Sequence, residues 1–257
     1  QMHEELLVVP ARLAWQPGKA TLCRKCDCPR PERAHHCHVC DVCVLRMDHH
    51  CPWIRNCVGF GNYKFFLLLV SYSALSVLVS LLLVLPEVIR CFEALLRVGG
   101  PPSWELPVSD TIAFLIFFIL AGFFLALLTP MLLTHFPLAA QNVTSIETHY
   151  TDADFNPFDR GSACANLEQI FGPWGLDWLL PVQPDQPVVD GVAFPYFNES
   201  AEAWEELPAN IVNASADEAG ERWKKHYCLP NAAEEAHAAG KGGGLTTLSV
   251  LAKWIAP

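Results

Sequence analysis

The chain has 257 residues, of which 52% are hydrophobic and 17% are charged, and its formal net charge is −10. This composition is too apolar for an ordinary soluble protein and favours a chain with membrane-spanning segments. Basic residues outnumber acidic ones by nine to six in residues 1–64, whereas residues 134–257 hold six basic and seventeen acidic residues. Because the acidic half repels phosphate, we expect no nucleic-acid partner for the chain as a whole.

A dense group of cysteines and histidines follows an N-terminal linker over residues 1–22. Eight of the eleven cysteines and five of the ten histidines lie between Cys23 and Cys57. Thiols in C-x-x-C pairs mixed with histidine are typical zinc ligands in a reducing compartment, whereas secreted disulfide scaffolds carry few histidines. We therefore predict a small zinc-binding domain over residues 23–64, because so short a segment with few large apolar residues needs a metal to fold.

This block contains more candidate ligands than zinc requires. Two tetrahedral sites need about eight ligands, and thirteen cysteines and histidines are present. A free thiol beside a histidine and a carboxylate lies in surroundings that favour the thiolate, and Asp48, His49 and Cys51 form such a group. A carboxylate that orients an imidazole, which deprotonates a thiol, is an arrangement of activated nucleophiles. The spacing alone is equally compatible with Cys51 as a zinc ligand and Asp48 as a turn residue.

Two apolar segments without a charged residue follow, over residues 65–85 and 111–133. Each is long enough to cross a hydrocarbon core of about 30 Å as a helix. The alternative is a pair of buried helices in a soluble core, but such helices are usually shorter and polar on one side. The basic flank before the first span places the cysteine block in the cytosol and the loop over residues 86–110 on the lumenal side.

Two spans return the chain to the cytosol, where we expect a C-terminal segment over residues 134–180. Residues 181–257 are rich in Pro, Ala and acidic residues, which is a poor composition for a hydrophobic core. We predict a largely disordered acidic tail there, with a short helix over residues 201–207. An N-x-T sequon begins at Asn142, and on the cytosolic side it should stay unmodified.

Several motifs carry a resemblance to a known family. Residues 48–53 read Asp-His-His-Cys-Pro-Trp, and residues 56–59 read Asn-Cys-Val-Gly. This pattern resembles the signature of the DHHC protein S-acyltransferases, membrane enzymes that move a fatty acyl group from acyl-CoA onto a protein cysteine. Thr-Ser-Ile-Glu at residues 144–147 is similar to the family's Thr-Thr-x-Glu motif, and Asn166 is similar to the asparagine of its C-terminal motif. The similarity covers about residues 23–181.

The resemblance implies roles for the site residues by position. One zinc would be held by Cys23, Cys26, His36 and Cys43, and a second by Cys37, Cys40, His50 and Cys57. Cys51 would be the acyl-accepting nucleophile, His49 its base and Asp48 the residue that orients His49. Ser145 keeps the hydroxyl that the family's threonine offers to Asp48, and Asn166 is expected to support the site.

Three basic residues outside the zinc sets are candidates for contact with the phosphates of coenzyme A: Arg30, Arg33 and His35. A solvated basic face is the alternative for them. Both zinc sites would be closed by protein ligands, so the metal is expected to be structural.

The fold expected from the resemblance is a mainly α integral membrane protein with a small cytosolic double-zinc domain of short β-hairpins and loops. The family has at least four spans, two of them before the cysteine block, and only 22 residues precede Cys23 here. We therefore expect two transmembrane helices of four, in a chain that begins midway through its parent or is a reduced variant.

The expected function is that of a protein-cysteine S-palmitoyltransferase that uses acyl-CoA as co-substrate. Its partners would be the lipid bilayer and cytosolic or membrane proteins with membrane-proximal cysteines. The resemblance implies a multi-pass protein of the Golgi, endoplasmic reticulum or plasma membrane, with the active site facing the cytosol. The alternatives are a catalytically inactive fragment and a membrane-tethered zinc module that binds a partner.

Overall fold

The structure is a computed structural model that describes residues 13–18, 21–26, 28–96, 107–152, 155–184, 189, 191, 194–198 and 202–205. The chain forms two compact units, one of residues 1–64 and 138–257 and one of residues 65–137. The cysteine-rich block therefore belongs to the same unit as the segment that follows the second long helix, although the two are far apart in the sequence.

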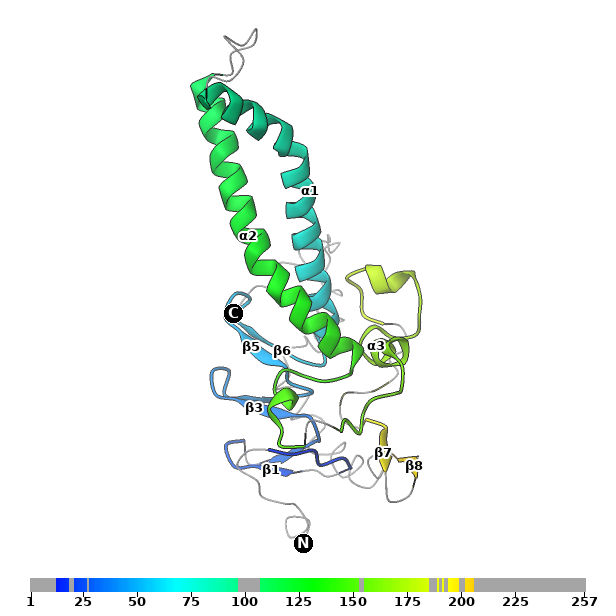
Figure 1. Cartoon of the computed structure of the whole chain (residues 1–257). Coiled ribbons are helices and arrows are strands. Elements are labelled where there is room, and N and C mark those ends of the chain that lie inside the picture. The colour runs from blue at the N-terminus through cyan, green and yellow to red at the C-terminus, as the bar shows by residue number, and fades with distance from the viewer. Residues whose placement is uncertain are drawn as a thin grey trace, which may run out of the picture. The chain divides into compact units, whose positions relative to one another are not determined.

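Six three-residue strands form three antiparallel hairpins in the first unit (Figure 1). The strands are β1 (Thr21–Cys23), β2 (Cys28–Arg30), β3 (His35–Cys37), β4 (Val42–Val44), β5 (His49–Cys51) and β6 (Asn56–Val58). The hairpins begin at Thr21, His35 and His49 and share one register, so the hairpin pattern repeats every 14 residues. The predicted small domain of short hairpins is confirmed. Because an isolated hairpin is marginally stable in water, the domain needs a further cross-link.

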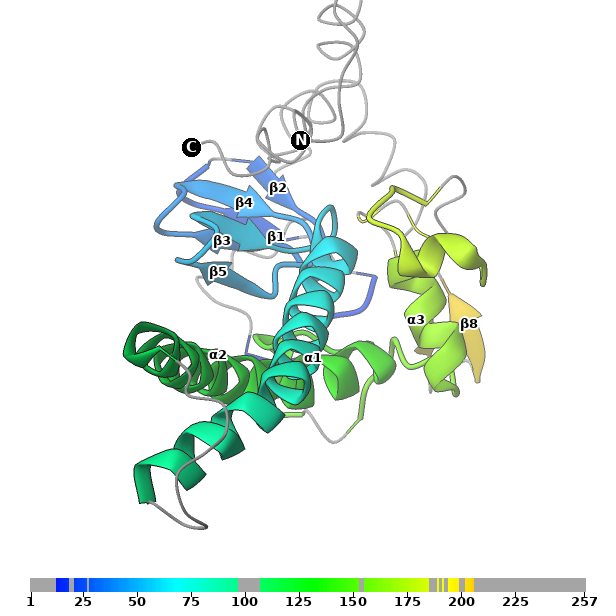
Figure 2. The same ribbon diagram turned by 90° about the horizontal axis from the view of Figure 1, so that it is seen from above.

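Two long helices make up the second unit and extend into the first, α1 (Tyr63–Leu96) and α2 (Val108–Ala140). Both are long and apolar enough to cross a membrane. They are longer than the predicted apolar segments, because helical hydrogen bonding continues into more polar flanks such as the Arg90–Glu87 pair. α1 bends in its second half, the part that contains Pro86 (Figures 1 and 2).

The segment after α2 contains a 3-10 turn η1 (Glu147–His149), helix α3 (Ala163–Phe171), a second 3-10 turn η2 (Leu176–Leu179), and a hairpin of β7 (Tyr196–Asn198) and β8 (Ala203–Glu205). Helix α3 begins at an N-cap, because the Ser162 Oγ accepts the Ala165 N–H at 3.2 Å. It ends at Gly172, whose φ of 81° lies in the left-handed region that glycine tolerates.

The start of the predicted disordered tail is folded instead. Strand β8 lies where a helix over residues 201–207 was predicted. Phe194 and Tyr196 are buried in a cluster with Phe158, against which Trp15 of the predicted linker also packs. The prediction was wrong here because it rested on the average composition of residues 181–257. That average concealed the short aromatic segment over residues 194–198. Residues 206–257 lie outside the described part of the chain.

Candidate active site and metal sites

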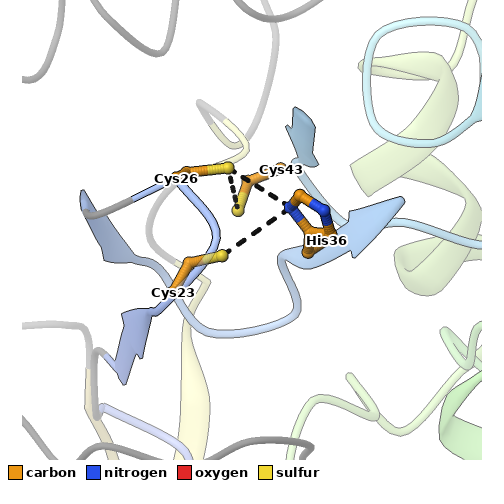
Figure 3. Close-up of side chains that lie close together, drawn as sticks. All are labelled: Cys23, Cys26, His36 and Cys43. Carbon is orange, nitrogen blue, oxygen red and sulfur yellow. Dashed lines mark hydrogen bonds between the residues drawn. The ribbon is translucent and has the colours of Figure 1, made fainter. Parts of the chain in front are cut away.

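The first predicted zinc set is assembled by two neighbouring hairpins (Figure 3). Cys23 and Cys26 lie at the β1–β2 loop, whereas His36 and Cys43 face each other across β3 and β4. The His36 Nδ1 lies 3.7 Å from the Cys23 Sγ and 3.2 Å from the Cys26 Sγ. The Cys43 Sγ lies 3.6 Å from the Cys26 Sγ. The four ligand atoms therefore point into one common space.

The second set repeats this arrangement one hairpin further along the chain. Cys37 and Cys40 lie at the β3–β4 loop, and His50 and Cys57 face each other across β5 and β6. The His50 Nδ1 lies 3.6, 3.4 and 3.7 Å from the three Sγ atoms of the set. Each set thus joins the loop of one hairpin to the strands of the next.

Both sets fit tetrahedral zinc. All four ligand atoms of each set lie within 4.8 Å of one another. Zinc bonds of about 2.3 Å to sulfur and 2.1 Å to nitrogen give tetrahedral edges of roughly 3.6 Å between N and S and 3.8 Å between two S atoms. Without metal, burial and then hydrogen bonds with Cys37 and Cys40 raise the pKa of Cys57. A cation held by this set would reverse the effect, because a coordinated thiol is deprotonated.

Two of the candidate catalytic residues, His49 and Cys51, lie on strand β5, and Asp48 directly precedes it. Side chains alternate along a strand, so His49 and Cys51 project from one face and the zinc-set residue His50 from the other. The Asp48 side chain is buried, and its Oδ2 lies 2.7 Å from the His49 Nδ1. With Nδ1–H donating to this carboxylate, the Nε2 of His49 carries the lone pair and can act as the base.

A second segment of the chain holds the Asp48 carboxylate. The backbone N–H of Ser145 donates to Asp48 Oδ1 at 2.8 Å, and the Ser145 hydroxyl donates to Oδ2 at 2.9 Å. Together with His49, this gives the buried carboxylate three hydrogen-bond donors. The side chain of Asp48 is thereby fixed, and it fixes the plane of the imidazole in turn.

The turn that carries Ser145 is anchored by a buried ion pair. The Arg33 Nε and Nη2 each donate at 2.8 Å to one carboxylate oxygen of Glu147. Glu147 also accepts the backbone N–H of Thr144 at 2.8 Å. Burial alone would raise the pKa of Glu147, but the Arg33 guanidinium holds it below its ordinary value. A two-pronged pair of this kind fixes geometry as well as charge.

Asn142 ties this pair to the rest of the unit. Its Oδ1 accepts from Arg33 Nη1 and Arg46 Nη2, both at 3.0 Å, and its Nδ2 donates to Gln169 at 3.0 Å. The side chain is fully buried, and its φ of 53° lies in the left-handed region. Burial, and then the neighbouring Arg33, lower the pKa of Arg46 to about 10. In the sequence, Asn142 was considered only as the start of a sequon. Its position just before the Thr-Ser-Ile-Glu motif was the signal for a structural role.

Comparison with known proteins agrees with this geometry. A family model described as DHHC palmitoyltransferase matches residues 16–151, which include the three hairpins and the Ser145 turn. The chain belongs to the DHHC palmitoyltransferase family.

Relatives of this DHHC chain carry names that describe acyl transfer. Probable protein S-acyltransferase 12 of Arabidopsis thaliana is 35% identical over 184 residues, which are 69% of this chain and 61% of that protein. Palmitoyltransferase ZDHHC2 of Mus musculus is 36% identical over 210 residues, which are 76% of this chain and 53% of that protein. Palmitoyltransferase ZDHHC15 of Homo sapiens is 34% identical over 203 residues, 74% of this chain and 57% of that protein. The chain thus spans between half and two thirds of the length of these relatives.

Two of the basic residues that were expected to contact coenzyme A in this DHHC chain, Arg30 and Arg33, have partners inside the protein instead. Arg33 is buried in the ion pair with Glu147, and its guanidinium lies over the rings of Phe158 and Phe194. Arg30 is buried and donates to the Thr21 hydroxyl at 3.0 Å. These positions do not support contact of either arginine with phosphate. A lone basic residue in a sequence does not reveal a distant internal partner.

The remaining predicted residues lie in the same unit of the DHHC chain. The Asn166 amide donates to the Ala140 carbonyl at 2.9 Å and to Asp159 at 2.8 Å, so it ties α3 to the end of α2. The His35 Nε2 lies 3.2 Å from the Tyr150 hydroxyl. Asn166 therefore supports the segment that carries Ser145 rather than touching Asp48 itself.

Proposed function

We propose that this chain is a protein S-acyltransferase that moves a long-chain acyl group, most simply palmitoyl, from acyl-CoA to cysteines of protein substrates. The observation that carries the proposal is the Asp48 carboxylate, held by Ser145 and bonded to His49, with Cys51 on the same face of β5 as His49. The names of the relatives support the same class of reaction.

The first step loads Cys51. His49 Nε2 takes the proton of the Cys51 thiol, and the thiolate attacks the carbonyl carbon of the acyl-CoA thioester. The bond from that carbon to the sulfur of coenzyme A breaks, and the leaving thiolate receives the proton from His49. The products are acylated Cys51 and free coenzyme A.

The second step passes the acyl group on. His49 takes a proton from the substrate cysteine, whose thiolate attacks the carbonyl of acylated Cys51. The Cys51 thiolate leaves and is reprotonated by His49. Both steps exchange one thioester for another, so the protein mainly has to position the reacting groups.

Zinc has a structural part in this proposal. Bound by the two sets of four ligands, it supplies the cross-links that three short hairpins cannot supply by burial. The second set fixes β5 and β6 to the loop before them, and thereby fixes the strand that carries His49 and Cys51.

The two long helices are proposed to lie in the membrane. Large apolar side chains of both long helices are exposed, for example Leu83 at 75% and Ile119 at 67%, as expected for helices that face lipid. We assign α1 and α2 as spans of a multi-pass endomembrane protein. Because α1 begins twelve residues after Cys51, the proposed nucleophile is close in sequence to the cytosolic membrane surface, where acyl chains enter. The charge of the first flank sets that orientation.

The direct test is formation of an acyl-enzyme by the full chain in detergent micelles. After incubation with palmitoyl-CoA, the chain should carry a hydroxylamine-sensitive acyl group, and Cys51→Ala should abolish it while both metal ions remain. Cys164→Ala is the matched control, because Cys164 is an exposed free cysteine on α3. Normal acylation of Cys51→Ala would refute the nucleophile. No acylation of any variant, with both ions retained, would favour a zinc-binding interaction module.

A further inference from the structure

The three hairpins share the exposure of their loops as well as their register. Each loop begins with a buried residue, continues with two exposed residues and reaches a partly buried fourth residue. The three loops are Cys23–Cys26, Cys37–Cys40 and Cys51–Ile54. The φ angles of the residues after the second and third loops, Asp41 at 55° and Arg55 at 49°, agree as well. The third loop therefore shares the register and the exposure pattern of the two loops that supply thiols to the metal sets.

Cys51 occupies a metal-ligand position of this repeat. The first residue of each loop is a cysteine, and Cys23 and Cys37 both belong to a zinc set. The fourth residue is Cys26 or Cys40 in the first two loops, but it is Ile54 in the third. The third loop thus retains one of the two sulfur positions.

The other half of such a site comes from the next hairpin. His36 and Cys43 complete the set that begins with the Cys23–Cys26 loop. His50 and Cys57 complete the set that begins with the Cys37–Cys40 loop. After β6 the chain enters α1 at Tyr63 instead of forming another hairpin. Cys51 consequently faces away from the second zinc set, at the end of the row of hairpins.

We propose that Ile54 determines the chemistry of Cys51, by withholding the second thiol that would turn this loop into a metal site. Two cysteines of one loop chelate a thiophilic ion together, whereas a single thiolate holds it weakly. A sulfur committed to metal cannot attack a thioester, so the apolar side chain of Ile54 keeps Cys51 available. The inference rests on the proposed function for the role of Cys51, but its metal chemistry is independent of acyl transfer.

The test restores the missing thiol. The full chain in detergent micelles is loaded with Zn²⁺, exposed to Cd²⁺ and freed of excess ion, and metal is counted by mass spectrometry. The wild-type chain should hold two ions, one for each set, and Ile54→Cys should hold a third. Maleimide labelling of Cys51 should then fall on the order of tenfold, because a metal-bound thiolate is not free to react. A chelator that removes the third ion should restore the labelling.

Two controls separate the thiol from other effects of the change. Ile54→Ser has nearly the size of cysteine without its sulfur, and it should keep two ions and a labelled Cys51. In Ile54→Cys with Cys51→Ser, the third ion should be lost. Ile54→His, which offers an imidazole nitrogen at the same place, is a second route to the same site. Phenylarsine oxide, which bridges two nearby thiols, checks Ile54→Cys without any metal.

The proposal is overturned if neither Ile54→Cys nor Ile54→His binds a third ion and the arsenical does not bridge Cys51. It is also overturned if Ile54→Ser gains the ion equally well. These outcomes differ from failure of the proposed function, in which the wild-type chain forms no thioester while Ile54→Cys still gains its ion.

Discussion

At the scale of single residues, the site depends on how completely Asp48 is satisfied. Its two carboxylate oxygens receive the Ser145 N–H, the Ser145 hydroxyl and the His49 imidazole. A buried carboxylate with several donors has one orientation, so the imidazole bonded to it has one as well. The residue that sequence similarity marks as a departure from the family, Ser145 in place of threonine, keeps the group that makes this bond.

Ser145→Ala should therefore slow autoacylation by about ten- to a hundredfold, because a hydrogen bond to a charged group contributes roughly 1.5–3 kcal/mol. The backbone N–H of residue 145 remains, so the loss should be partial. Ser145→Thr, which keeps a hydroxyl, is the matched control and should stay near the wild-type rate. The rate of thioester formation is the measurement, and a Ser145→Ala chain as fast as wild type would show that the hydroxyl is dispensable.

Similarity of short motifs predicted the two sets of metal ligands but not the interactions that hold the segments around them. The hairpins and both sets of four ligands were expected, since Cys and His at fixed spacing have few other uses. The Arg33–Glu147 pair joins residues 114 positions apart, and Asn142 joins that pair to Arg46. No local period marks such contacts, so Arg33 could not be distinguished from a surface residue before the fold was known.

At the scale of elements, we propose that the two zinc sets have different roles, although their ligand arrangements are similar. The first set joins the hairpin β1–β2 to β3–β4, and the second joins β3–β4 to β5–β6. Only the second holds the strand that carries Cys51. Loss of either set should remove a cross-link from the row of hairpins, but only loss of the second should also release the strand that carries the proposed nucleophile.

Cys23→Ser and Cys37→Ser form a matched pair for this difference, since both residues begin a loop and each belongs to one set. Each variant should lose one metal ion, because a structural site depends on all its ligands. Cys37→Ser should lose autoacylation almost completely, whereas Cys23→Ser should retain a measurable part of it. The measurements are metal content and thioester formation on the same samples. Greater loss in Cys23→Ser would contradict the separate roles.

At the scale of the whole molecule, the proposed acyl transfer at the membrane surface requires that α1 and α2 lie in lipid. Their exposed apolar side chains would be unfavourable in water, as the composition of the chain already suggests. The acidic residues gather in the segments after α2, away from the basic flank before α1, whose charge we propose sets the orientation. The sequence predicted two apolar segments from the absence of charge, and the helices α1 and α2 are longer than those segments.

Ile119→Arg should weaken membrane insertion, because an arginine near the centre of a spanning helix costs about 2.5–3.5 kcal/mol. Val39→Arg places the same charge on an exposed loop of the hairpin domain and should leave insertion unchanged. The fraction of chain that stays with membranes after an alkaline carbonate wash measures the effect. Equal retention of both variants, with no fall from wild type, would argue against α2 as a span.

The central claim is that the two faces of β5 divide catalysis from metal binding, and two adjacent histidines test it most directly. His49→Ala should keep both metal ions and lose roughly 10² to 10⁴ in the rate of autoacylation, the usual value of general-base help. His50→Ala should lose one ion and the stability of the hairpin domain, because His50 belongs to the second set. Metal content, thermal unfolding and acylation rate are measured on both variants. Equal metal content and equal stability in the two would contradict the account.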